Sequence, residues 1–264
     1  MLEINKVYNE DCLTTMANVP DNFIDLTVTS PPYDNLRKYN GFSFEFEKIA
    51  IEVFRVIKIG GVVVWVVGDQ TKDGTESGTS FRQALFFKEI GFNLHDTMIY
   101  KKENYLPLNH NRYDPEFEYM FILSKGRPKT FNPLKIKCKT AGDGYNFKNR
   151  NSSSVNEIGN PLRARDEDKI TKEEKYRGNI WSYATGKNKG SKDAISFLHP
   201  ATFPEKLAED HILSWSNKDD LIYDPFMGSG TVAKIAKILG RNFIGSEISA
   251  DYCDIANKRL LEGI

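Results

Sequence analysis

The sequence has few of the features that would place it outside ordinary globular proteins. Cysteine is scarce: Cys12, Cys138 and Cys253 are too few and too far apart to indicate a disulfide framework or a zinc site. No apolar run approaches the roughly 20 residues that a membrane-spanning helix needs, and the longest, residues 62–67, is strand-sized. The N-terminus lacks the basic and apolar stretches of a signal peptide. These absences favour a cytoplasmic protein with no membrane segment and no metal site.

Net charge is also absent, because 36 Lys plus Arg balance 36 Asp plus Glu. The charge is nevertheless unevenly distributed along the chain. Residues 125–193 contain 17 basic and 8 acidic residues, an excess of nine, whereas the remainder contains 19 basic and 28 acidic residues. Such a separation is typical of a segment that binds a polyanion, although a solvated basic loop would have the same composition.

Hydrophobic patterns on both sides of this segment predict alternating strands and helices. Before it we expect strands at 23–29, 62–67, 93–100 and 118–123, and helices at 44–57 and 81–90, the first of them ended by Gly60 and Gly61. After it we expect helices at 204–215, 231–239 and 251–261, and strands at 220–224 and 242–247. Residues 128–194 show no clean period, and no internal repeat is visible. The pattern predicts an α/β fold with a doubly wound, mostly parallel sheet and one insertion.

The segment Asp-Pro-Phe-Met-Gly-Ser-Gly-Thr at 224–231 lies between an expected strand and an expected helix. Gly228 and Gly230 allow a tight turn and the close approach of a ligand to the helix N-terminus. Glu247 follows 17 residues after Gly230, at the end of the next strand, where an acidic side chain commonly accepts hydrogen bonds from ribose hydroxyls. A Gly-x-Gly alone also occurs in simple turns. With the strand, the helix and Glu247 in register, the segment predicts a site for an adenosine-containing cofactor.

A second candidate motif, Ser30-Pro31-Pro32-Tyr33, comes directly after the strand expected at 23–29. An amine conjugated to an aromatic base is a poor nucleophile, and acceptors that draw its hydrogens out of the ring plane make it a better one. The Ser30 side chain and the Pro31 carbonyl could accept these two hydrogens, and Tyr33 offers a face on which an extruded base can stack. By itself, Pro-Pro after a strand is usually a turn, so the interpretation needs both motifs.

Together the two motifs resemble those of DNA amino-methyltransferases in the circular order called the beta class. There a (D/N/S)PPY loop precedes the cofactor loop, and the target-recognition region lies between them. Further similar segments are residues 9–12, 55–61, 68–69 and 199–206, so the resemblance covers about two-thirds of the chain. It implies a Rossmann-like fold with three parts: a catalytic half at 1–127, a target-recognition region at 128–194 and a cofactor-binding half at 195–264.

The resemblance also implies S-adenosyl-L-methionine as the cofactor and assigns the residues of the site. Ser30, Pro31, Pro32 and Tyr33 would be catalytic, and the cofactor would contact Asp11, Lys206, Asp224, Phe226, Gly228, Gly230, Thr231 and Glu247. Within this set, Glu247 would bind the ribose, Lys206 would lie near the methionine carboxylate, and Thr231 would cap the next helix. Asp11 would contact the adenine, although an aspartate in its place could equally cap a helix. Cys12 is no candidate nucleophile, because the Pro-Cys loop of cytosine carbon-5 methylation is absent.

The expected activity is therefore methyl transfer to an exocyclic amine in double-stranded DNA at a specific target site. Serine before Pro-Pro-Tyr is commoner in relatives that act on N4 of cytosine, so the resemblance favours cytosine over N6 of adenine. Three other functions stay open: the same chemistry on RNA, methylation of a protein glutamine, and a non-catalytic DNA-binding module. Also open are a homodimer and a cognate restriction endonuclease as partners. The sequence does not reveal the recognition site.

Overall fold

The computed structural model describes residues 2–33, 44–105, 111–139, 144–145, 169–170, 172–185 and 203–262. Contacts divide the chain into two compact units. The larger unit comprises Met1–Asn132 and Asn179–Ile264, and the smaller one is Pro133–Gly178.

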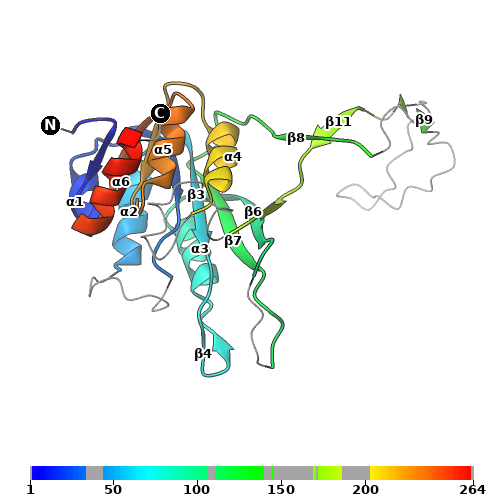
Figure 1. Ribbon diagram of the computed structural model, residues 1–264, viewed down its shortest axis with the longest axis horizontal. Helices are drawn as coiled ribbons and strands as arrows, with labels where there is room; N and C mark the ends of the chain where they lie inside the picture. The colour runs from blue at the N-terminus through cyan, green and yellow to red at the C-terminus, as the bar shows by residue number, and fades with distance from the viewer. Residues whose placement is uncertain are drawn as a thin grey trace. The chain divides into compact units, whose positions relative to one another are not determined.

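An eight-stranded sheet forms the centre of the larger unit (Figure 1), in the order β1-β14-β13-β2-β3-β7-β6-β12. Its strands are β1 (Lys6–Tyr8), β2 (Ile24–Thr29), β3 (Ile57–Val67), β6 (Asn93–Lys102), β7 (Phe117–Ser124), β12 (Ile180–Tyr183), β13 (Leu221–Asp224) and β14 (Asn242–Ser246). Strand β7 is antiparallel to β3 and β6, whereas the other neighbouring pairs are parallel. The predicted doubly wound, mostly parallel fold is thereby confirmed.

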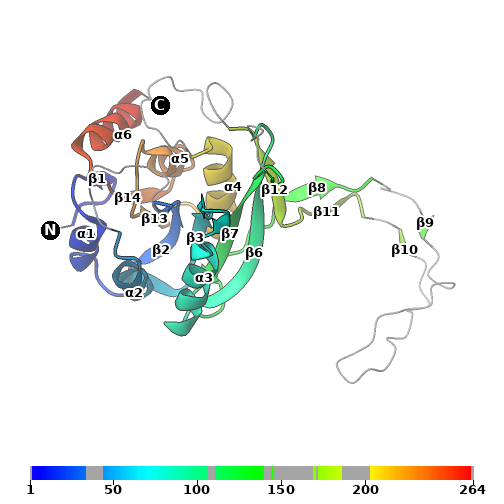
Figure 2. The ribbon, with the colours of Figure 1, turned by 90° about the horizontal axis from the view of Figure 1, so that it is seen from below.

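Helices cover both faces of this sheet (Figure 2). One face carries α1 (Cys12–Ala17), α2 (Phe46–Val56) and α3 (Thr79–Glu89), and the other carries α4 (Glu205–Trp215), α5 (Thr231–Ile238) and α6 (Ala250–Glu262). Because helices cover both faces, a central strand must be apolar on both sides. The continuous run at 62–67 in β3 meets this condition, since each of its residues is at most 1% exposed.

The end of α2 differs from the prediction, because Gly60 and Gly61 do not follow the helix but lie inside β3. The helix ends at Val56, and Ile57 is already extended. The pairing of β2 with β3 shifts register between Ile24 and Leu26, and Gly60 has a φ of +85° at this irregularity. The glycines therefore permit a bulge in a strand instead of ending a helix.

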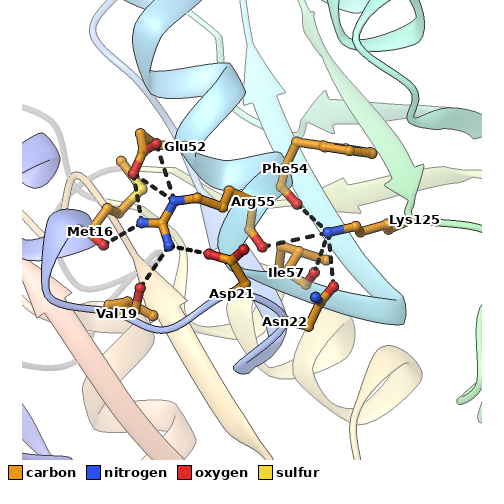
Figure 3. Close-up of polar contacts among 9 residues, drawn as sticks. All are labelled: Met16, Val19, Asp21, Asn22, Glu52, Phe54, Arg55, Ile57 and Lys125. Atoms are coloured by element: carbon orange, nitrogen blue, oxygen red, sulfur yellow. Dashed lines mark hydrogen bonds and ion pairs between the residues drawn. The ribbon is translucent and has the colours of Figure 1, made fainter.

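Two cations hold the C-terminal end of α2 in place (Figure 3). The Arg55 guanidinium donates to the carbonyls of Met16 and Val19, 2.6 and 2.8 Å away. Lys125 Nζ donates to the carbonyls of Phe54 and Ile57, at 2.7 and 3.1 Å. Cations near a helix C-terminus satisfy carbonyls that lack an intrahelical partner. This network joins the helix end to the neighbouring loop and to the end of β7.

The smaller unit contains two antiparallel strand pairs. Strand β8 (Lys135–Lys137) pairs with β11 (Glu174–Tyr176), and β9 (Gly144–Tyr145) pairs with β10 (Lys169–Ile170). This unit, Pro133–Gly178, spans fewer residues than the predicted recognition region at 128–194. Part of that region, Ile180–Tyr183, forms β12 and pairs with β6 in the main sheet.

A short hairpin of β4 (Thr71–Lys72) and β5 (Thr75–Glu76) follows β3 in the larger unit. Within the parts of the chain that the structure describes, no helix has both the length and the apolar character needed to cross a membrane.

Candidate functional site

The two predicted motifs follow neighbouring strands in the centre of the sheet. Strands β2 and β13 are parallel, with Leu26 paired to Ile222 and Thr27 to Tyr223. From β2 the chain passes through α2 to β3 on one side, and from β13 it passes through α5 to β14 on the other. Ligands of doubly wound sheets bind at the carboxyl ends of strands at such a switch point. The loops beginning at Ser30 and Pro225 both start there.

A buried hydrogen bond connects the two loops at their origin. Thr29 Oγ1 donates to Asp224 Oδ1 at 2.6 Å, and the same oxygen accepts from the Phe226 backbone N–H at 3.0 Å. Asp224 is only 4% exposed, and burial raises the pKa of its carboxyl to about 7. The residue predicted to shape the cofactor site therefore also fixes the two loops relative to each other.

Glu247 lies at the end of β14, facing the glycine turn. Its Oε2 accepts from the Gly228 backbone N–H at 2.8 Å, and its Oε1 accepts from the Ser249 N–H at 2.9 Å. The side chain is largely buried, and this burial raises its pKa. Each carboxylate oxygen can accept more than one hydrogen bond, so the two backbone contacts orient Glu247 and leave acceptor capacity for a ligand's hydroxyls.

Gly230 shows why this turn requires glycine. Its φ is +79°, and a Cβ there would lie 2.8 Å from the Ala256 Cβ on α6. The predicted cap of α5 was wrong, because the N-cap is Gly230 and Thr231 is the first helical residue. The Thr231 hydroxyl instead accepts from Arg259 Nη1 at 3.0 Å.

Arg259 is a residue of this site that the sequence did not indicate. The residue is 2% exposed, and its guanidinium donates to the Ser229 carbonyl at 2.5 Å and pairs with Glu205 at 2.9 Å. From α6, it holds the middle of the loop at 224–231, about 30 residues earlier in the chain. No pattern in the sequence distinguishes Arg259 from Lys258, the other basic residue of its helix.

The remaining predicted cofactor residues differ in their surroundings. The centroid of the Phe226 ring lies 5.6 Å from that of the Phe44 ring and 6.2 Å from that of the Trp65 ring, so Phe226 packs against both. Asp11 caps α1, since its Oδ1 accepts from the Leu13 N–H at 2.7 Å. Lys206 is exposed and pairs with Asp210 and Glu209 of its own helix, at 2.8 and 3.1 Å. Contacts of Asp11 and Lys206 with a cofactor therefore stay predictions.

Hydrogen bonds constrain the loop that contains Ser30 and Tyr33. Ser30 Oγ donates to the Tyr33 hydroxyl at 2.8 Å, and that hydroxyl lies 2.8 Å from Glu118 Oε2 and 3.2 Å from the Val66 carbonyl. Pro31 is buried, whereas Ser30, Pro32 and Tyr33 are partly exposed. Glu118 also forms an ion pair with Lys102 at 2.8 Å. Glu118 begins the strand expected at 118–123, and Lys102 lies two residues beyond the strand expected at 93–100. Nothing in the sequence connected either residue with the motif.

Cys12 has the properties of a core residue. It is buried in the hydrophobic core, and burial raises the pKa of its thiol to about 12, so the reactive thiolate is suppressed. Among the residues that the structure describes, no group of three or more His, Cys, Asp or Glu is arranged to hold a metal ion.

The chain is similar in sequence to known proteins of one family. The profile of the N6/N4 methyltransferase family, described as DNA methylase, matches residues 24–258. The orphan methyltransferase M.BamHII of Bacillus amyloliquefaciens is 56% identical over 243 residues, which are 92% of this chain and 91% of that protein. The type II methyltransferase M.BglII of Bacillus subtilis is 30% identical over 264 residues, covering 96% of this chain and 68% of that protein.

Solved structures share the fold. PvuII DNA methyltransferase (cytosine-N4-specific) matches with a TM-score of 0.68 and 23% identity, over 98% of this chain and 93% of that chain. The M1.HpyAVI–SAM complex matches with a TM-score of 0.61 and 24% identity, over 97% and 99% of the two chains. Because both identities are below 25%, these similarities support a shared fold but not a shared activity.

Proposed function

The chain belongs to the S-adenosyl-L-methionine-dependent DNA methylases that modify the amino group of cytosine or adenine, and within this class we propose that it methylates N4 of cytosine. The observation that carries the choice of base is Ser30, because serine before Pro-Pro-Tyr is commoner in the cytosine-N4 enzymes that the sequence resembles. The base would be flipped out of the duplex, since its amine is not accessible to an enzyme inside the stack.

The residues around the glycine turn fit the cofactor. Glu247 is a buried carboxylate with spare acceptor capacity, and Gly230 adopts a conformation and packing that exclude a Cβ. We assign the ribose to Glu247, and the methionine and ribose surroundings to Asp224, Phe226, Gly228 and Gly230. Asp11 would contact the adenine and Lys206 the methionine carboxylate. When bound, S-adenosyl-L-methionine supplies an electrophilic methyl group on a positively charged sulfur.

The chain's own residues would prepare the target amine. The Ser30 oxygen and the Pro31 carbonyl each accept one amino hydrogen, drawing the nitrogen towards tetrahedral geometry so that its lone pair leaves the ring system. Tyr33 stacks on the extruded base. The Thr29–Asp224 hydrogen bond, 2.6 Å long, keeps these groups next to the cofactor loop. Catalysis would thus depend mainly on position and hydrogen bonding.

DNA with a specific target site is the proposed macromolecular substrate, and residues 128–194 the proposed recognition region. The cytoplasm is the compartment in which we expect the protein to meet that DNA. A homodimer and a cognate endonuclease stay predictions.

Nucleoside analysis tests the proposed base. Unmethylated DNA is incubated with the protein and S-adenosyl-L-methionine, digested to nucleosides and analysed by mass spectrometry, with the Ser30→Ala variant as the control. We expect 4-methylcytosine from the unaltered protein and a strong loss with the variant. Finding only 6-methyladenine would contradict the cytosine assignment. If the protein methylated RNA or a protein glutamine but not DNA, the proposal that DNA is its substrate would be wrong.

A further inference from the structure

Two charged residues outside both motifs are linked to the catalytic loop. Lys102 near the end of β6 and Glu118 near the start of β7 lie on neighbouring strands, and Lys102 Nζ is 2.8 Å from Glu118 Oε1. The other carboxylate oxygen, Oε2, is 2.8 Å from the Tyr33 hydroxyl, which is 2.8 Å from Ser30 Oγ. Four side chains thus form a continuous chain that ends at the serine proposed to act on the target amine.

The carboxylate determines the direction of every hydrogen bond in this chain. An ionised carboxylate can only accept, so the Tyr33 hydroxyl must donate its single hydrogen to Glu118. The competing acceptor, the Val66 carbonyl, is neutral and lies farther away, at 3.2 Å. The phenol oxygen then accepts, and Ser30 donates its only hydrogen to Tyr33. The lone pairs of the Ser30 oxygen remain for an incoming amine hydrogen.

Without Glu118, the direction of the hydrogen bond between Tyr33 and Ser30 could reverse. A Tyr33 hydroxyl without a carboxylate partner could donate to Ser30, whose own hydrogen would then be free to point at the substrate. A hydroxyl hydrogen facing an amino hydrogen is repulsive, and the serine would no longer be fixed as an acceptor. Hydrogen bonds in series also polarise one another, so an anion at one end makes the oxygen at the other end a better acceptor.

We propose that Glu118, held by Lys102, is a positioning residue for methyl transfer, because it acts through Tyr33 to fix Ser30 as a hydrogen-bond acceptor. This inference rests on the proposed roles of Ser30 and Tyr33. It also gives a physical reason why a neutral serine hydroxyl can occupy the position at which other members of the family carry aspartate. Glu118 supplies part of the missing negative charge through the hydrogen-bonded side chains.

The Glu118→Gln variant tests the proposal, since it keeps the size of the side chain and removes the charge that sets the direction. We expect kcat to fall about five- to tenfold, the difference between a charged and a neutral acceptor. The dissociation constant of S-adenosyl-L-methionine and the KM for DNA should change less than about twofold, because neither ligand is bound by Glu118. The matched control is Glu116→Gln, which breaks the neighbouring Lys101–Glu116 pair, at 3.2 Å, and should leave kcat unchanged.

Non-additivity separates this role from a general loss of structure. Tyr33→Phe keeps the stacking ring and interrupts the same chain, so the double variant with Glu118→Gln should be no slower than the slower single variant. Melting temperatures of all variants show whether each is folded. A kcat for Glu118→Gln equal to that of the unaltered protein, or a double variant whose loss is the product of the two single losses, would overturn the proposal.

Ser30→Ala distinguishes failure of this inference from failure of the proposed function. If Ser30→Ala is inactive while Glu118→Gln is fully active, the role of Glu118 is wrong and that of Ser30 stands. If Ser30→Ala is as active as the unaltered protein, the proposed role of Ser30 is wrong, and the inference about Glu118 falls with it.

Discussion

A single carboxylate, that of Glu247, joins the end of β14 to the glycine turn after β13 through its bond to the Gly228 N–H, 2.8 Å long. Because it is oriented by two backbone groups, it can present acceptors to a ribose without losing side-chain entropy on binding. At the scale of single residues, this preorganisation supports the proposed role of Glu247 in cofactor binding.

Glu247→Ala should weaken the binding of S-adenosyl-L-methionine by about 1–3 kcal/mol, since it removes hydrogen bonds to a charged group and leaves buried N–H groups unpaired. Isothermal titration calorimetry measures the change. Asp251→Ala, which removes an exposed carboxylate from the first turn of α6, is the matched control and should bind as the unaltered protein does. An unchanged dissociation constant for Glu247→Ala would place the ribose elsewhere.

Asp224 should make the stability of the ligand-free protein depend on pH. Its folded-state pKa of about 7 lies above its ordinary value of 3.8, so between these values the folded state binds more protons than the unfolded state. The free energy of unfolding contributed by this group therefore falls as the pH rises from about 4 to about 7 and is constant above that range. Thermal unfolding of the unaltered protein and of Asp224→Asn between about pH 5 and pH 8 compares the two.

In Asp224→Asn the titrating group is absent, while the amide oxygen can still accept from Thr29. We expect the melting temperature of the variant to fall less, as the pH rises, than that of the unaltered protein. Parallel pH profiles for the two proteins would show that the buried carboxyl does not titrate in this range.

At the scale of elements, the turn between β13 and α5 is held between the sheet and α6. Gly230 contacts Ala256 of α6, and Arg259 of the same helix donates to the Ser229 carbonyl at 2.5 Å. The position of α6 therefore constrains the shape of this turn, although α6 itself carries none of the predicted cofactor residues.

Gly230→Ala should destabilise the protein and weaken cofactor binding, because the new Cβ would lie 2.8 Å from the Ala256 Cβ and 2.9 Å from its Cα. We expect a loss of about 2–4 kcal/mol in the free energy of unfolding, combining left-handed strain with overpacking. Gly74→Ala is the matched control. Gly74 has the same φ of +79° but nothing within 4 Å of its added Cβ, so only the strain, about 1–2 kcal/mol, should appear.

Chemical denaturation measures both glycine variants, and calorimetry measures their affinity for S-adenosyl-L-methionine. Equal losses of stability in the two variants would show that contact with α6 adds nothing to the requirement for glycine at position 230.

At the scale of the whole molecule, the basic excess is not spread evenly through the region predicted to recognise DNA. Residues 140–171 contain 5 basic and 5 acidic residues, so they add no net charge. The other parts of the 125–193 segment therefore hold 17 − 5 = 12 basic and 8 − 5 = 3 acidic residues. Pairing of β8 with β11 brings Lys137 and Lys175 into one ribbon, and Lys139 and Lys172 lie two residues beyond these strands. All four side chains are exposed.

Replacing these four lysines by alanine should reduce the salt dependence of DNA binding. Each phosphate contact contributes about 0.9 to the slope of log K against log salt, so the slope should become less steep by up to about 3.6. Fluorescence anisotropy with a labelled duplex at several salt concentrations measures it. A control variant with alanine at the exposed Lys48, Lys88, Lys218 and Lys258 has the same charge change elsewhere. Equal slopes for the two variants would contradict a DNA-binding role for the ribbon.

Much of the fold follows from local pattern alone. The apolar run at 62–67 could only be a strand covered on both faces, and the predicted helices and strands outside the basic segment are present, with ends shifted by a few residues. Helix α1, with six residues, and β1, with three, were missed, because such short elements contain too few residues to show a period. The glycine pair at 60–61 was misinterpreted, since a glycine after a helix and a glycine in a bulge look the same along the chain.

The sequence by itself determined which chemical groups the candidate site contains, because Ser30-Pro31-Pro32-Tyr33, the glycine turn and Glu247 are local patterns tied to strand ends. Only the tertiary structure decided which other residues act on them. Thr29 and Asp224 are 195 residues apart, and Tyr33 and Glu118 are 85 apart. Strand β12 likewise joins the sheet beside β6 through pairing with a distant segment. Such contacts depend on strand order and register, which burial of the whole sheet selects and which no short stretch of sequence encodes.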